Sequence, residues 1–114
     1  MTPDERLKTA VETATGYLVH NGVAFEHDPV YYVMNIAAVP TCYADDDAQY
    51  ERLLGQLNLY APLDMNITAL KRTTKRSIHS AGFTWPSAED LSDNEGRHIV
   101  FEFEDAEAAD YGED

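Results

Sequence analysis

Residues 64–85, DMNITALKRTTKRSIHSAGFTW, decide the fold, because they combine a helical pattern with signals for a helix start and a helix stop. Apolar and small residues recur at intervals of three and four, which predicts a helix with one buried face. Either Asp64 or Asn66 is placed to cap the first turn, and Gly82 to end the last turn in a left-handed conformation. The stripe expected to face a core consists of Ile67, Leu70, Thr74, Ile78 and Ala81.

The other side of this predicted helix is cationic. Lys71, Arg72, Lys75 and Arg76 are four of the eight Lys and Arg residues in a chain with a formal net charge of -13. We name these four residues the cationic ridge. Two interpretations of the ridge stay open: a solvated helix face, or a docking surface for an acidic partner or for a neighbouring copy of this acidic chain.

Patterns on both sides of residues 64–85 predict the other elements. Thr2 and Glu5 have the form of a capping box, with Pro3 at the first helical position, so a helix is expected to begin there. Its apolar face continues to about residue 20, where Asn21-Gly22 should end it. Alternating apolar and β-branched residues predict strands at 30–39, 51–61 and 97–105, with a short additional strand at 23–25.

Polar and acidic segments separate these elements. Loops are expected at 40–48, which holds three consecutive Asp residues, and at 86–96. The tail at 106–114, AEAADYGED, is expected to be disordered because it is acidic and offers little to bury. Phe83 and Trp85, directly after the central helix, are expected to close one end of the core.

The order of elements is therefore helix, short strand, strand, strand, helix, strand. It predicts an α+β fold with a mostly antiparallel four-stranded sheet and two helices packed on one face. At 114 residues the chain suits one domain, which we place at residues 1–105. The single cysteine, Cys42, excludes an intrachain disulfide and fits a reducing compartment.

The sequence contains no constellation typical of catalysis or of a bound cofactor. Its six glycines are isolated and form no phosphate-binding loop, and its four histidines show no metal-ligand spacing. The serines lie in no nucleophile motif. The carboxylate pair Glu102 and Glu104 is more simply explained as solvent-facing than as a general acid and base. We therefore expect a protein that is not an enzyme and that uses neither cofactor nor metal.

The charge and the apolar segments exclude two further classes. A charge of -13 repels a phosphate backbone, so sequence-independent nucleic-acid binding is not expected. The longest nearly apolar run, residues 30–40, is far too short to cross a bilayer, and the charged N-terminus MTPDERLKTA lacks the apolar stretch of a secretory signal. The expected location is the cytosol.

Several segments in this order resemble the tail-terminator and tail-completion family of long-tailed bacteriophages. A Tyr-ended strand, a helix ending in Gly-Phe, an acidic loop and a strand opening with a basic residue or histidine are typical of that family. The corresponding positions here are Tyr60, Gly82-Phe83 and Arg97-His98. The resemblance covers roughly residues 1–105 and is carried by VYYVMNIA, ADDDAQY, LLGQLNLYAP, ITALKRTTKRSIHSAGF, SAEDLSDNEG and RHIVFEFE.

The resemblance implies a structural protein of virion assembly. Its copies would close into a ring, typically a hexamer, that caps the tail tube protein and joins the tail to the head-tail connector protein. DNA would pass through an acidic lumen without specific binding, and no membrane would be involved. The protein would be found in the host cytoplasm during assembly and then in the neck of the virion.

A closed ring needs two different patches on each subunit, one for each neighbour. The predicted pair is the cationic ridge and the acidic loops at 44–51 and 87–95. The acidic residues that we expect in this interface are Asp45, Asp46, Asp47, Glu89 and Asp90.

Three other readings stay open. The first is another neck or connector component, such as a head-closure subunit, which would resemble a compact β-barrel. The second is an acidic inhibitor that mimics DNA, which predicts acids in regular surface rows. The third is a small enzyme of unknown type.

Overall fold

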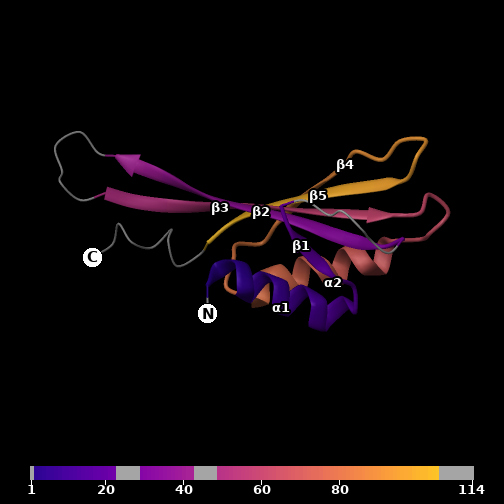
Figure 1. Ribbon diagram of the computed structural model, residues 1–114, viewed down its shortest axis with the longest axis horizontal. Helices are drawn as coiled ribbons and strands as arrows, with labels where there is room; N and C mark the ends of the chain where they lie inside the picture. The colour runs from indigo at the N-terminus through magenta and orange to yellow at the C-terminus, as the bar shows by residue number, and fades with distance from the viewer. Residues whose placement is uncertain (1, 23–28, 43–48, 106–114) are drawn as a thin grey trace.

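The computed structural model describes residues 2–22, 29–42 and 49–105, and for residues 39–42 and 49–52 the backbone alone. The described part of the chain is an α+β fold with two helices on one face of a five-stranded sheet (Figure 1). The elements are α1 (Pro3–Thr15), β1 (Val19–Asn21), β2 (Tyr31–Cys42), β3 (Gln49–Ala61), α2 (Thr68–Ser80), β4 (Ser87–Asp90) and β5 (Arg97–Glu104).

The sheet has the strand order β1-β2-β3-β5-β4. β1 and β2 are parallel, and every other neighbouring pair is antiparallel. The predicted α+β class and the largely antiparallel sheet are confirmed, whereas the predicted number of four strands is wrong. The two strands that were not expected are β1 and β4, and the short strand expected at 23–25 lies outside the described residues.

The first helix begins as predicted but is shorter. Thr2 accepts a hydrogen bond from the Glu5 backbone N–H at 3.2 Å and caps α1. The helix ends at Gly16, which has a φ of 80° and donates its N–H to the Glu12 carbonyl at 2.9 Å. The predicted end at Asn21-Gly22 is wrong because Gly16, six residues before Gly22, already takes the left-handed conformation that ends the helix. The chain then turns back and forms β1 beside β2.

The central helix α2 lies within residues 64–85, as predicted. Asn66 Oδ1 accepts the Thr68 N–H at 3.0 Å, and Gly82 has a φ of 101° just after the helix. The predicted stripe faces the core, where Thr74 and Ile78 are fully buried. The Thr74 hydroxyl donates to the Leu70 carbonyl, so the Tyr32 hydroxyl, 2.7 Å away, donates to Thr74. This buried bond joins α2 to the sheet.

The core lies between the two helices and the sheet. The alternation predicted for β2, β3 and β5 is confirmed where the strands lie under the helices, because every second residue in 32–34, 57–61 and 99–103 is buried on that side. It does not continue along β2, where Ile36 is half-buried and Ala38 is exposed. The fully buried side chains are Leu7, Val11, Tyr32, Leu57, Leu59, Thr74, Ile78, Ile99 and Phe101.

Both predicted loops are wrong in part. Residues 40–42 continue β2, because there β2 has a neighbour on one side only, where a proline without an N–H is tolerated. Residues 87–90, expected within a loop, form the edge strand β4, which pairs with β5. All four residues of β4 are exposed, so the strand carries no apolar alternation that would reveal it.

The hairpin of β2 and β3 extends beyond the rest of the fold. β1 pairs with β2 only up to Met34, and β5 pairs with β3 only as far as Leu54. Residues 37–42 and 49–53 therefore form a ribbon whose two strands pair with no third strand of the described chain, and we name this ribbon the arm. The arm is roughly 20 Å long at ~3.4 Å per residue. It projects past the helices in Figure 1 and gives the molecule extents of 53 × 25 × 24 Å.

Candidate protein-interaction surface

The cationic ridge lies on the solvent side of α2. Arg72 and Arg76 are exposed, and Lys71 and Lys75 are half-buried. Within the described part of the chain, none of these four side chains forms an ion pair, and the ion pair found there joins Arg6 to Asp105. The positive charge of the ridge is therefore not neutralised by a direct contact with a described carboxylate.

Trp85 adds an apolar surface to the ridge. Its side chain is 55% exposed, and its ring lies 5.8 Å from the His79 ring in an edge-on arrangement. A surface hollow of about 340 Å³ is lined by Thr68, Lys71, Arg72, Lys75 and Trp85. Tryptophan and arginine are the side chains that most often dominate protein interfaces. The ridge therefore has the composition of a docking site.

Trp85 is the residue whose role the sequence reasoning missed. Phe83 is buried and closes the core, as predicted, but Trp85 does not join it. Phe83 packs edge-on against Phe103 at 5.0 Å, and the chain then leaves the core toward β4. Both residues are large aromatics in a short extended segment, so the linear pattern alone does not separate them.

The structure places the predicted acidic residues Glu89 and Asp90 on opposite faces of β4. Glu89 pairs with Val100 on the face of the sheet away from the helices, and Asp90 pairs with Ile99 on the helix face. Hydrogen bonds from Ser92 lower the pKa of Asp90, and the nearby charge of Lys71 lowers it further. Asp90 therefore lies on the same side of the molecule as one end of the ridge, and Glu89 does not.

The predicted acidic residues Asp45, Asp46 and Asp47 lie outside the described residues. They belong to the segment that joins Cys42 to Gln49, the last pair of the arm. The described backbone thus places the attachment points of this segment at the far end of the arm and the ridge on the body (Figure 1). Of the predicted acidic residues that the structure describes, only Asp90 lies near the ridge.

The face of the sheet away from the helices carries a row of aromatic rings across three strands. Tyr31 stacks on Tyr60 at 5.0 Å, and Tyr60 stacks on His98 at 4.5 Å. His98 Nε2 also lies 2.9 Å from Asn58 Oδ1. We name this surface the open face. Its further exposed residues include the carboxylates Glu89 and Glu102.

The described residues contain no group of three or more His, Cys, Asp or Glu side chains that could hold a metal ion. Ser77 and Ser80 donate their hydroxyls to backbone carbonyls of α2. None of the described helices is long and apolar enough to cross a membrane. The features that remain as a candidate site are the ridge with Trp85, the arm and the open face.

Comparison with known proteins adds no family to this description. The chain matches no protein-family model, and a search of curated proteins returns no relative.

Proposed function

We propose that this protein is a structural subunit of virion assembly that closes into a ring with its own copies, caps a phage tail tube and joins the tail to the head connector. The observation that carries the proposal is the separation of two complementary patches. The cations lie on the body at α2, whereas the segment with three consecutive Asp residues is attached to the far end of the arm.

Because the two patches are separated, the cations of the ridge are more readily paired with acids of another copy than with the acidic segment of their own subunit. The arm holds Cys42 and Gln49, between which the acidic segment is attached, away from the body (Figure 1). A contact between the arm of one copy and the ridge of the next is heterologous, and such contacts generate rings when the rotation between copies closes. A ring therefore uses both patches of every subunit.

The arm itself supports contact with a neighbour. A ribbon of only two strands is marginally stable in water, and its unpaired strand edges are templates for further pairing. Ala37 and Ala38 are exposed at its base, and Leu54, next to them in the ribbon, is 38% exposed. Burial of these apolar side chains and of Trp85 against neighbouring copies adds a hydrophobic contribution to the charge attraction.

The open face supports a role around DNA. No Lys or Arg occurs in residues 19–22, 29–38, 53–60 or 98–104, which include the open-face positions of β1, β2, β3 and β5 up to Ala38, and the carboxylates of this face repel phosphate. If the rings close with the open face toward the axis, the lumen lets DNA pass without binding it. Two helices over an open sheet also favour a terminator over a head-closure subunit, for which a compact β-barrel is expected.

An exchange of charges tests the proposal. Reversal of the ridge (Lys71→Glu, Arg72→Glu, Lys75→Glu and Arg76→Glu) should leave the monomer folded and abolish ring formation on purified tail tubes. Reversal of the arm (Asp45→Lys, Asp46→Lys and Asp47→Lys) should do the same. A double variant with both reversals should regain ring formation, because the two patches are complementary again.

Light scattering and electron microscopy of capped tubes provide the measurement, and circular dichroism controls for folding. The ridge reversal makes the net charge more negative and the arm reversal makes it less negative, so loss of ring formation in both separates specific pairing from an effect of net charge. Unchanged ring formation by both single reversals would overturn the proposal. The proposal would also be overturned if the wild-type protein stayed monomeric and never capped a tail tube.

A further inference from the structure

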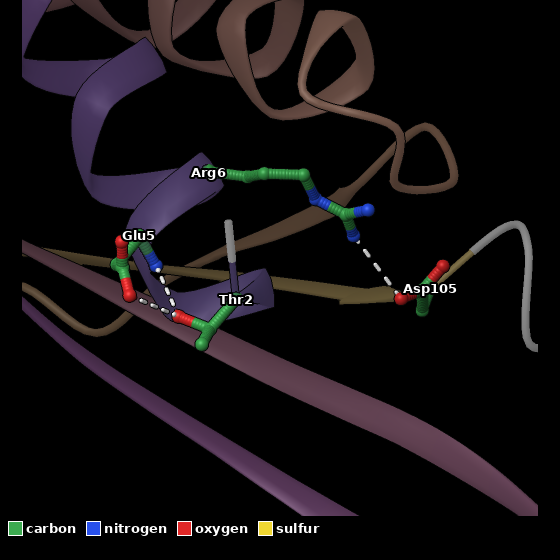
Figure 2. A network of polar contacts seen from close by, with 4 residues as sticks. All are labelled: Thr2, Glu5, Arg6 and Asp105. Carbon is green, nitrogen blue, oxygen red and sulfur yellow. Dashed lines mark hydrogen bonds and ion pairs between the residues drawn. The ribbon is translucent and has the colours of Figure 1, made fainter.

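The last described residue, Asp105, is fixed to the fold by three contacts. Its carboxylate forms an ion pair with Arg6 at 3.1 Å (Figure 2), and its N–H donates to the Leu53 carbonyl at 3.0 Å. It also pairs with Phe83 as an isolated bridge, and its side chain is nearly buried. The position after which residues 106–114 begin is therefore fixed by the fold.

This point lies close to the segment that carries Trp85, and Trp85 in turn borders the ridge. The Thr84 N–H donates to the Glu104 carbonyl at 2.8 Å, so the segment that carries Trp85 runs beside the end of β5. Trp85 lines two surface hollows. One, of about 340 Å³, also contains Glu104 and Leu54, and the other is the hollow that it shares with Lys71, Arg72 and Lys75. A path over the Trp85 ring thus connects the root of the tail with the ridge.

The tail has the charge and the length to follow this path. Its sequence, AEAADYGED, contains four carboxylate side chains and no Lys or Arg. Nine extended residues reach roughly 30 Å, whereas the six positions from Lys71 to Arg76 cover only about 8 Å of a helix. Glu102 and Glu104 line the hollow at the root of the tail, so repulsion directs an acidic tail away from them and toward the cations.

We propose that in the free subunit the C-terminal tail, residues 106–114, binds the ridge and the Trp85 hollow of its own chain. This inference rests on the proposed function, because it treats the ridge as the docking surface. It adds that the tail competes with the acidic partner for the ridge. A tethered segment has an effective concentration in the millimolar range, so even weak contacts occupy the site. An acidic partner then has to displace the tail, which delays association between free subunits.

The inference is tested on the free monomer with a tail of unchanged length and no side-chain charge. This variant carries Glu107→Gln, Asp110→Asn, Glu113→Gln and Asp114→Asn. Backbone amide and Trp85 indole signals are compared in the two proteins by NMR at low and high salt. At low salt, differences should be confined to α2 and Trp85, should not depend on protein concentration, and should disappear in high salt because screening removes the attraction.

Competition provides a second readout. A peptide with the sequence ADDDAQY, residues 44–50, should bind the neutral-tail variant about fivefold more tightly than the wild type, because no tethered competitor occupies the ridge. Lys75→Glu with Arg76→Glu is the control and should weaken peptide binding in both backgrounds.

The outcomes distinguish this inference from the ring proposal. Identical α2 and Trp85 signals with equal peptide affinities would overturn tail binding and leave the ring proposal standing. Signal differences that grow with protein concentration would also overturn it, because the tail would then bind another copy. A third outcome would separate the two proposals in the other direction. If the Lys75→Glu, Arg76→Glu control loses tail binding while ridge-reversed protein still forms rings normally, the tail binds the ridge but the ring interface does not use it.

Discussion

Gly55→Ala tests whether the sheet is packed as closely as the structure indicates. Gly55 lies in β3 directly opposite Phe103 of β5. A methyl group added at this position would lie 2.6 Å from Phe103 Cζ and 2.8 Å from Phe103 Cδ2, distances that real side chains do not adopt. Phe103 is nearly buried and packs edge-on against Phe83, so its ring has little room to move.

The expected loss of stability follows from two opposing effects. Insertion of a methyl group into a packed core costs about 1–3 kcal/mol. Replacement of glycine by alanine reduces the entropy of the unfolded chain and returns about 0.4–1 kcal/mol. The steric effect is the larger, so Gly55→Ala should lower the free energy of unfolding by about 1–2 kcal/mol.

Urea denaturation, followed by circular dichroism, measures this loss. With a slope of about 1–2 kcal/mol per molar urea, the midpoint should fall by about 1 M. Phe103→Leu in the Gly55→Ala background should recover part of the loss, because the smaller side chain removes the clash, and the two changes should not be additive. Equal or higher stability of Gly55→Ala, or the same loss with Leu at position 103, would refute the packing argument.

Two further predictions concern buried polar groups. Burial raises the pKa of Tyr32 to about 12. Because the folded state keeps this phenol protonated while the unfolded state ionises near pH 10, stability should be fully present below pH 10 and fall by about 2–3 kcal/mol toward pH 12. Urea midpoints between pH 9 and 12 should show this fall in the wild type and a smaller fall in Tyr32→Phe. Asp105→Asn should lower the free energy of unfolding by about 1–3 kcal/mol at neutral pH, because it removes the ion pair with the half-buried Arg6 guanidinium. Equal urea midpoints of Asp105→Asn and wild type in low salt would contradict this account of the ion pair.

The sequence predicts those elements whose signal is local and repeated. The α2 stripe repeats over four turns, and the alternation of β5 places Ile99, Phe101 and Phe103 on one face, so both elements are found correctly. The capping box at Thr2 is equally local. Their positions depend on contacts between residues close in sequence, which a linear pattern records.

The missed elements depend on contacts between residues far apart in sequence. β4 consists of four exposed residues and exists because β5 offers it a partner edge. β1 forms where Gly16 stops the helix early and Val19 reaches Tyr32. The exposure of Trp85 likewise follows from the path of the chain between α2 and β4. For the same reason, the sequence indicated the charge of the ridge but not that Asp90 shares its side of the molecule.

The proposed association between copies accounts for the concentration of positive charge on one helix of a strongly acidic protein. Two copies that each carry a net charge of -13 repel one another at long range. At physiological ionic strength the screening length is about 8 Å, so a carboxylate that touches the ridge interacts with its four cations and only weakly with acids further away. The same four cations spread over the surface would each be surrounded by acids of their own subunit. Attraction between copies is therefore possible only at a short, clustered patch, and any acidic segment that reaches this patch, from a neighbour or from the tail of the same chain, competes for it.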